Sequence, residues 1–131
     1  MVVNSMGAVN SPPRMWLKAE GLAVFALSSL TYYVFGGPWW LYVLLILAPD
    51  LAMLGYLGGP ALGARLYNLA HSYVGPIILA IVGAVTASAA VAVALIWCAH
   101  IGMDRMLGYG LKYPTAFGDT HLGTVGKRPG V

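Results

Sequence analysis

Ionisable residues inside apolar sequence limit what this chain can fold into more than any other feature. Asp50, His71, His100 and Asp104 interrupt or end stretches that otherwise resemble membrane-spanning sequence. An ionisable group in the hydrocarbon core of a bilayer costs several kcal/mol, so such side chains face a shared protein interior and usually serve a function. We therefore predict that these four residues meet at one site within a bundle of helices.

Composition places the chain among membrane proteins. Of its 131 residues, 60% are hydrophobic and only 8% are charged, whereas soluble domains contain roughly 25% charged residues. The net charge of +3 comes from Lys and Arg residues that are scattered along the chain. A nucleic-acid interface needs these charges clustered on one face, so we predict no nucleic-acid partner. Cys98 is the single cysteine, which excludes an intrachain disulfide.

Four apolar segments follow a polar N-terminal stretch, and each is close to the roughly 20 residues that a helix needs to cross a bilayer. Gly-Gly-Pro turns end the first two segments. The last two join at residues 86–88, where we expect a break because one continuous helix would be about twice too long for a bilayer. We predict an all-α polytopic membrane protein, with a flexible segment at 1–16, a four-helix transmembrane domain at 17–109 and a tail at 110–131; its apolar segments are 17–35, 39–57, 64–85 and 87–107.

The positive charges predict the orientation of these helices. Lys and Arg are enriched in cytoplasmic loops of membrane proteins. With four spans, all seven positive residues of this chain fall on one side, namely Arg14, Lys18, Arg65, Arg105, Lys112, Lys127 and Arg128. We therefore expect both termini to be cytoplasmic, and Trp39 and Trp40 to lie in the opposite membrane interface, where aromatic residues gather.

With this topology, the polar residues lie at similar depths in the membrane. At a rise of about 1.5 Å per residue, Asp50 and His100 both lie roughly 18 Å from the outer ends of their helices, and Asp104 lies about one turn deeper. His71 is about 10 Å, and Glu20 about one turn, from the cytoplasmic ends of theirs. The sequence therefore predicts a common site in the cytoplasmic third of the bundle.

The residue types at this site are those of a metal centre. His100 and Asp104 are spaced i, i+4, and Asn68 and His71 are spaced i, i+3, so each pair projects from one helical face. With Asp50 from a third helix, these side chains could hold Zn²⁺ or a similar divalent ion. We predict Asp50, His71, His100 and Asp104 as ligands, and Asp50, His100 and Asp104 as catalytic groups. The same residues could instead form a proton relay or polar contacts between helices.

Further residues could complete the site. Arg105 and Lys112 could hold a substrate phosphate, although both could equally be topology anchors that reach the headgroups. We treat Glu20, Asn68, Asp119 and His121 as possible accessory residues, because the tail could fold back over the opening or remain a surface loop. Pro49, directly before Asp50, removes a backbone hydrogen bond and should kink its helix.

An ordered set of motifs gives a family resemblance. Its main elements are Ala48-Pro49-Asp50-Leu51, Tyr67-Asn68-Leu69 with His71-Ser72-Tyr73, Ala99-His100-Ile101-Gly102 with Asp104-Arg105, and Asp119-Thr120-His121-Leu122-Gly123. Over about residues 17–123, the chain resembles the DUF4260 family of small bacterial integral membrane proteins, which implies a location in the bacterial inner membrane. The pattern of Asp and His at helix ends is also similar to membrane-bound metal-dependent hydrolases of the YdjM type.

Two functional hypotheses follow. The first is a metal-dependent membrane hydrolase that acts on a lipid-linked or phosphorylated substrate at the cytoplasmic leaflet, with membrane lipid as its partner. The second is a non-enzymatic subunit or binding module, a homo-oligomer or part of a larger membrane complex, in which the polar cluster organises helix packing or holds a ligand. Stoichiometric metal in the purified protein would favour the first hypothesis.

Overall fold

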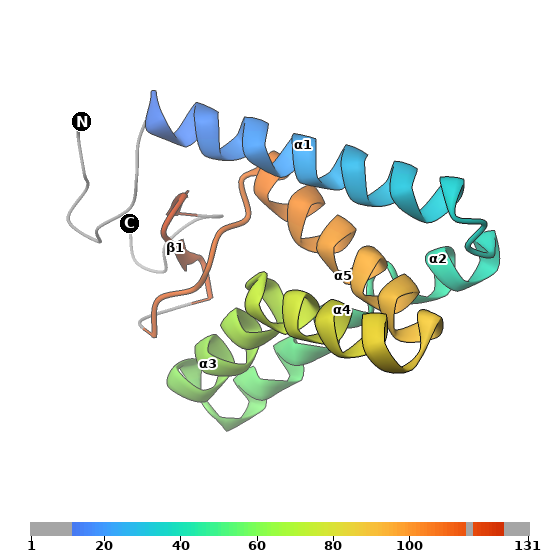
Figure 1. The fold of residues 1–131 in the computed structure, drawn as a ribbon. Coiled ribbons are helices and arrows are strands. Elements are labelled where there is room, and N and C mark those ends of the chain that lie inside the picture. The colour runs from blue at the N-terminus through green and yellow to red at the C-terminus, as the bar shows by residue number, and fades with distance from the viewer. Residues whose placement is uncertain (1–11, 115–116, 125–131) are drawn as a thin grey trace.

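The computed structural model describes residues 12–114 and 117–124, and it is mostly helical (Figure 1). This confirms the all-α prediction apart from one small hairpin in the tail. Most of the predicted flexible N-terminal segment lies outside the described residues. In chain order the elements are α1 (Pro13–Val34), α2 (Trp39–Leu45), the 3₁₀ helix η1 (Ala48–Gly58), α3 (Pro60–His71), α4 (Val74–Thr86), α5 (Ser88–Leu107), β1 (Asp119–Thr120) and β2 (Gly123–Thr124).

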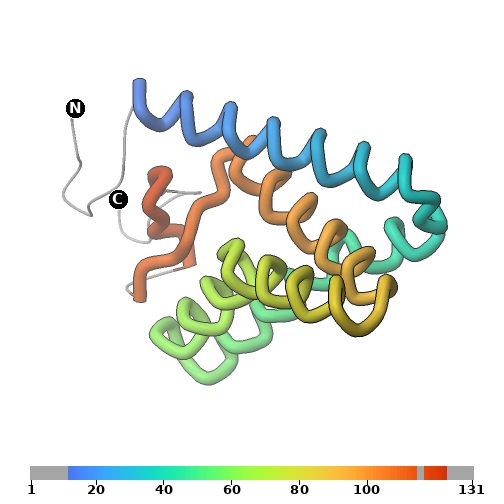
Figure 2. Tube along the Cα trace, in the orientation of Figure 1, coloured from blue at the N-terminus to red at the C-terminus, as the bar shows by residue number. Residues whose placement is uncertain are grey.

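Helix α5 is the centre of the structure, with α1 packed against one side of it and α4 against another (Figures 1 and 2). Helix α3 packs mainly against η1. Two glycines bring α1 and α5 close together: a Cβ atom on Gly21 would lie 2.8 Å from the Gly102 carbonyl oxygen, and one on Gly102 would lie 2.6 Å from the Phe25 nitrogen. Small residues at such crossings let membrane helices approach closely.

Helix α1 begins at Pro13, four residues before the predicted start of the first segment. Proline suits this position, because the first turn of a helix has no intrahelical partner for its N–H groups. The helix ends at the predicted Gly-Gly-Pro turn, where Gly36 adopts a φ of 76°. Only glycine reaches such a conformation without steric cost.

The second apolar segment, where we predicted a kink at Pro49, is interrupted more strongly than by a kink. Helix α2 ends at Leu45, and the chain continues as the 3₁₀ helix η1 from Ala48. Pro49 is the local cause, since it has no N–H to continue the α-helical hydrogen bonds. The Asp50 N–H instead donates to the Leu47 carbonyl at 3.1 Å, three residues back.

The third segment is also broken. It consists of α3 and α4, which are bent by 42° relative to each other. Ser72 between them is extended, with φ −101° and ψ 153°. By contrast, the break predicted between the third and fourth segments is confirmed, because Ala87 is extended (φ −153°, ψ 125°) and α5 starts at Ser88.

Two stretches of the described chain are long and apolar enough to cross a membrane, Trp39–Gly58 and Ser88–Leu107, and α3 with α4 makes a third if the bent pair is one span. Helix α1 is not among them, and its N-terminal turns carry Arg14, Lys18 and Glu20. Large apolar side chains are exposed over the outer surface, among them Leu30, Leu47, Ile77 and Val85. Such extensive apolar exposure is typical of a lipid-facing surface.

The tail runs back from the end of α5 and lies between the start of α1 and α3 (Figure 2). Strands β1 and β2 pair antiparallel, with Asp119 opposite Thr124. Lys112 forms an isolated bridge with Thr120. Leu122 and Thr120 are completely buried, so the hairpin packs against the rest of the protein.

Candidate metal centre

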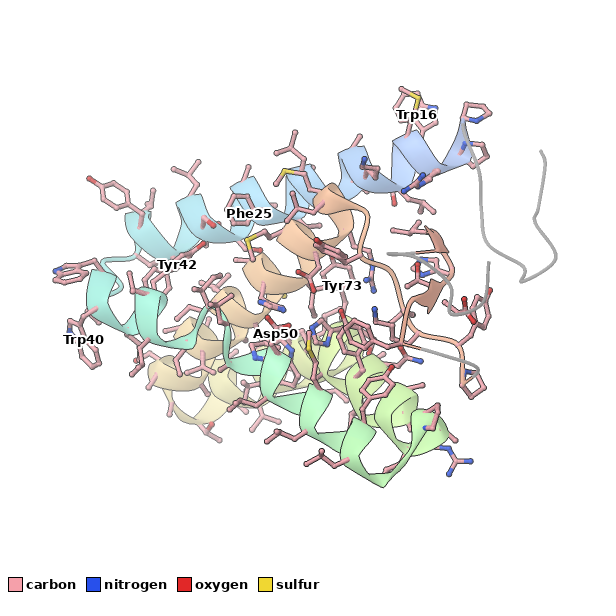
Figure 3. All side chains as sticks on the ribbon, turned by 180° about the vertical axis from the view of Figure 1, so that it is seen from behind. Trp16, Phe25, Trp40, Tyr42, Asp50 and Tyr73 are labelled. Atoms are coloured by element: carbon pink, nitrogen blue, oxygen red, sulfur yellow. The ribbon has the colours of Figure 1, made fainter. Side chains whose placement is uncertain are left out.

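Four ionisable side chains from three segments meet at one point, as the sequence predicted. His71 of α3 lies with its Nε2 3.1 Å from Nε2 of His100 on α5. Oδ1 of Asp50 on η1 is 3.1 Å from the first of these nitrogens and 3.2 Å from the second. Oδ2 of Asp104 is 3.4 Å from each. All four potential ligand atoms lie within 4.8 Å of one another. Figure 3 shows Asp50 near the middle of the molecule.

Helix α5 presents one continuous face to this point. Trp97, His100 and Asp104 are spaced i, i+3 and i+7, which places them in a row along the helix. His100 and Asp104 enter the cluster, while the Trp97 indole N–H donates to the Ala70 carbonyl at 2.5 Å. That carbonyl belongs to the last turn of α3, which has no helical N–H to pair with it. Trp97 therefore fixes the end of α3 beside His71.

Backbone carbonyls fix the tautomer of both histidines. Nδ1 of His71 lies 2.9 Å from the Tyr67 carbonyl oxygen, and Nδ1 of His100 lies 2.5 Å from that of Ile46. A carbonyl oxygen can only accept, so each Nδ1 carries the proton and donates it. In the neutral rings, each Nε2 then presents a lone pair to the cluster. Histidines that ligate metals are oriented by this kind of hydrogen bond.

Pro49 explains why the Ile46 carbonyl is available. In a 3₁₀ turn that carbonyl would accept from residue 49, which as proline has no N–H. In an α-helix it would accept from residue 50, but the Asp50 N–H pairs with Leu47 instead. The break in the helix therefore supplies the acceptor that orients His100. We predicted a kink from Pro49, and the structure shows what the kink does.

The four potential ligand atoms are all acceptors when the rings are neutral, and the Tyr67 hydroxyl donates to one of them, Oδ2 of Asp104, at 3.5 Å. Two Nε2 lone pairs and two carboxylate oxygens converge on one small volume, which is repulsive unless something positive lies among them. Protonating both imidazoles would bring two N–H groups within 3.1 Å of each other, so the two rings cannot readily carry a proton at Nε2 at the same time. Ligand atoms about 2.1 Å from a tetrahedral Zn²⁺ would be roughly 3.4 Å apart, close to the distances here. The geometry fits a divalent ion of this size.

Access to the cluster is from the side of Asp50. The side chains of both histidines are completely buried, and that of Asp104 is 10% exposed, whereas the Asp50 side chain is 34% exposed. A solvent- or lipid-accessible ligand beside three enclosed ones leaves room for an exchangeable group at that position.

Arg105 is held by the backbone rather than pointing into the cluster. Its Nη2 donates to the His71 carbonyl at 2.8 Å, and its Nη1 donates to the Tyr109 carbonyl at 3.0 Å. Like Trp97, it satisfies a carbonyl that the end of α3 leaves without a helical partner. The phosphate contact that we predicted for Arg105 would compete with these two hydrogen bonds.

Sequence reasoning did not identify Tyr67 as part of the site. Its ring stacks on the His71 imidazole, with centroids 3.7 Å apart and planes 5° from parallel. Its hydroxyl lies 3.5 Å from Oδ2 of Asp104. The spacing of Tyr67 and His71, i and i+4, was the available signal.

Lys112 and Asn68 attach the tail to this region. The Lys112 ammonium lies 4.8 Å from the centroid of the Tyr67 ring and 3.9 Å from that of Phe117. Its backbone N–H donates to the Asn68 side chain, whose amide donates back to the Lys112 carbonyl, at 2.6 and 2.8 Å. Burial lowers the pKa of Lys112, while the negative charge of Asp104 acts in the opposite direction.

The remaining accessory residues lie outside the cluster. The Leu111 N–H donates to Nδ1 of His121 at 2.9 Å, and burial lowers the pKa of this histidine. The Asp119 carbonyl accepts from the Tyr113 N–H at 2.8 Å, and Glu20 is exposed on α1. None of the three contributes an atom to the group of four potential ligands. The tail thus covers the site without supplying a ligand from its described residues.

Comparison with known protein families gives a match over most of the chain. A family model described as "Domain of unknown function (DUF4260)" matches residues 14–125 and confirms the family resemblance found in the sequence. No curated protein and no solved structure shows significant similarity to the chain.

Proposed function

The chain belongs to the DUF4260 family, and we propose that it is an integral membrane protein that binds a divalent first-row metal ion through Asp50, His71, His100 and Asp104 and uses it for hydrolysis. Its substrate would be a lipid-linked or phosphorylated compound at the cytoplasmic leaflet of the bacterial inner membrane. One observation carries this proposal: two imidazole lone pairs and two carboxylates converge, each within 3.4 Å of at least two others, with the Nδ1 protons directed away.

Charge balance supports a divalent ion over a proton. The cluster contains two carboxylates and two imidazoles, so its formal charge is about −2 when the rings are neutral. A single shared proton would leave one negative charge in a largely enclosed site, whereas a divalent ion compensates both. Uncompensated charges in such surroundings are costly. Lys112 adds positive charge at the tail side of Asp104, where it would also attract an anionic substrate.

The catalytic role rests on the opening at Asp50. Structural zinc sites are usually closed by four protein ligands, while catalytic sites keep a position for water or substrate. Bound metal would lower the pKa of such a water toward neutrality. With its side chain 34% exposed, Asp50 is suited to exchange places with water or to accept its proton. Asp104 and His100 would hold the ion.

A non-enzymatic role is the second candidate, and the number of ligands favours it. Four protein ligands from η1, α3 and α5 could saturate a tetrahedral ion. The ion would then link the packed pair of η1 and α3 to α5, with which that pair shares little packing. In that case the protein would be a subunit or binding module of a larger membrane assembly. A structural ion would exchange slowly and its removal would unfold the protein, whereas a catalytic ion could be removed and restored.

Metal analysis tests the proposal directly. We expect detergent-purified protein to contain about one first-row divalent ion per chain, as elemental analysis would measure, and to lose it on dialysis against a chelator. Re-addition should restore the ion with the helical circular dichroism unchanged. Protein that never contains or takes up stoichiometric metal would refute the proposal and favour a proton-bound cluster.

We also propose that the chain crosses the membrane four times with both termini cytoplasmic. Two observations support this topology. With four spans, all Lys and Arg residues fall on one side of the membrane, and the break at Ala87 separates the third and fourth apolar segments. Single cysteines can test it in a Cys98→Ser background: Phe35→Cys, at a side chain that is 83% exposed, and Pro114→Cys, at an exposed residue after α5. An impermeant thiol reagent should label the first from outside intact cells and the second only after permeabilisation. Labelling of both from the same side would refute four spans.

A further inference from the structure

An apolar groove of about 230 Å³ lies beside the metal centre. Its walls come from the break between α2 and η1, from the end of α3 and from α5, and include Leu45, Ala48, Ala70, Val93 and Trp97. Ala48 and Ala70 are small, which leaves space between the walls, and Pro49 at the break also lines the groove. The same helix break that orients His100 therefore also opens the groove.

The groove and the cluster share their structural elements. Pro49 lines the groove and precedes Asp50, Ala70 lines it and precedes His71, and Trp97 lines it one turn before His100. The hydrogen bond from Trp97 to the Ala70 carbonyl joins two of the walls. The apolar groove thus lies next to the cluster, lined by the residues that directly precede Asp50 and His71.

We propose that this groove binds the alkyl chain of a lipid whose anionic head group faces the metal centre. The inference rests on the proposed metal site and specifies its substrate class. The substrate would be an amphiphile with an alkyl chain and a phosphate or carboxylate head group. The ion attracts the head group, and Lys112 adds positive charge on the tail side. The alkyl chain of the lipid would enter the groove from the surrounding membrane, because the nearby surface carries exposed apolar side chains such as Leu44, Leu47 and Leu51.

The head group must supply the selectivity of this site. Inside a bilayer or micelle, an apolar groove gains little by exchanging one alkyl chain for another, because the surroundings are equally apolar. An alkyl chain is therefore retained in this groove only when the head group of the same lipid is bound at the metal. An uncharged amphiphile of the same chain length should bind no better than the surrounding detergent.

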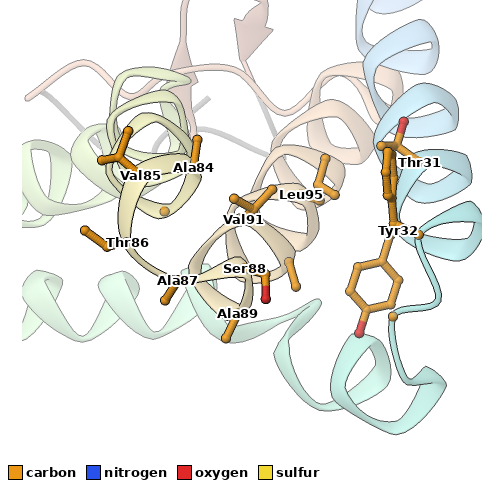
Figure 4. A pocket seen from close by; sticks show the side chains of 14 residues that line it. Thr31, Tyr32, Ala84, Val85, Thr86, Ala87, Ser88, Ala89, Val91 and Leu95 are labelled. Carbon is orange, nitrogen blue, oxygen red and sulfur yellow. The ribbon is translucent and has the colours of Figure 1, made fainter.

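A second cavity in the structure provides a matched control. It measures about 670 Å³ and lies at the turn between α4 and α5, facing Thr31 and Tyr32 of α1 (Figure 4). It contains no member of the Asp/His cluster. Val91 lines this cavity, while Val93, on the same helix, lines the groove. The same substitution at the two positions therefore adds the same volume in two different places.

Quenching of Trp97 fluorescence tests the inference. The chain has four tryptophans, and replacing Trp16, Trp39 and Trp40 with phenylalanine leaves Trp97 alone in the groove. The probe is an alkyl phosphate with a terminal bromine, added to metal-loaded protein in a neutral detergent; an alkyl glucoside with the same brominated chain is the uncharged comparison. We expect saturable quenching by the phosphate and only weak, non-saturating quenching by the glucoside.

The variants Val93→Phe and Val91→Phe test whether the alkyl chain lies in the groove. Val93→Phe should weaken binding of the brominated phosphate roughly tenfold, because the added ring overpacks the groove when the alkyl chain lies in it. Val91→Phe should leave the affinity unchanged, and both variants should keep their metal. Equal quenching by phosphate and glucoside, or no effect of Val93→Phe in protein with stoichiometric metal, would overturn the groove inference. Absence of metal from the wild type in the same samples would overturn the proposed function instead.

Discussion

Replacing His100 with alanine should remove stoichiometric metal from the protein. His100 supplies one of two Nε2 atoms to the cluster, and it is fully buried. Loss of a residue that only orients a ligand typically reduces metal affinity about 10–100-fold, so loss of the ligand itself should reduce it by more than about 100-fold. Elemental analysis after gel filtration, and titration with a chromophoric competitor, would measure the change. Asp104→Ala should have an effect of the same order.

His121→Ala is the matched control, because it removes a histidine from the tail without touching the cluster. Its metal content should equal that of the wild type. His100→Ala also leaves the Ile46 carbonyl without its donor, which costs about 1–3 kcal/mol for a buried group. Circular dichroism should show that helices persist, and His100→Gln provides a second variant of similar size. Unchanged metal in both His100 variants would mean that His100 is not a ligand and instead makes a polar contact between helices.

The composition of the site could be predicted from the sequence because membrane burial makes ionisable residues rare and informative. Asp50, His71, His100 and Asp104 stand out against apolar sequence, and their positions along four alternating segments bring them to one depth. The structure brings these same four side chains together. Helix geometry and segment boundaries were sufficient for this prediction, and small errors in the boundaries did not change it.

The backbone at the site could not be predicted in the same way. Hydropathy identifies an apolar stretch but does not report whether it is one helix or two, so the breaks after Leu45 and at Ser72 were missed. Pro49 signalled a kink, but the carbonyl that the kink frees, that of Ile46, pairs with the His100 ring, 54 residues away in sequence. Contacts of this range depend on the tertiary arrangement, which a single sequence does not give.

Breaks in these helices coincide with the functional side chains, and a physical reason connects the two. A regular helix pairs its internal carbonyls with its own N–H groups, so it offers no unpaired carbonyl to a side chain from another element. The break at Ile46 frees a carbonyl for His100, and the end of α3 frees those of Ala70 and His71 for Trp97 and Arg105. The site of this protein therefore lies where the regular helical hydrogen bonds are interrupted.

Asp50→Asn should change stability in opposite directions with and without metal. In the metal-bound protein the substitution removes a charged ligand, so the stabilisation from binding should be lost. That loss is about 2.7 kcal/mol when free metal is at roughly 100 times its Kd. Thermal unfolding in detergent with excess Zn²⁺ should therefore show a lower midpoint for the variant than for the wild type.

After chelation the sign should reverse. Without metal, the Asp50 carboxylate faces two Nε2 lone pairs at 3.1 and 3.2 Å, and all three are acceptors. The side-chain amide that Asp50→Asn introduces could direct its NH₂ group toward them and donate, which removes a charge and converts a repulsive contact into a hydrogen bond. A net gain of about 1 kcal/mol is typical of such a bond, lessened here because Asp50 is partly exposed. The chelated variant should thus unfold at a higher temperature than the chelated wild type.

Two further comparisons make the sign of this effect decisive. Glu20→Gln neutralises an exposed carboxylate outside the cluster, so it should shift neither midpoint. If a proton rather than a metal relieves the cluster, Asp50→Asn would alter stability equally in the two conditions, because chelation would change nothing at the site. A carboxylate that only pairs with a protonated histidine behaves in this way, and an equal shift with and without chelator would assign Asp50 to that role.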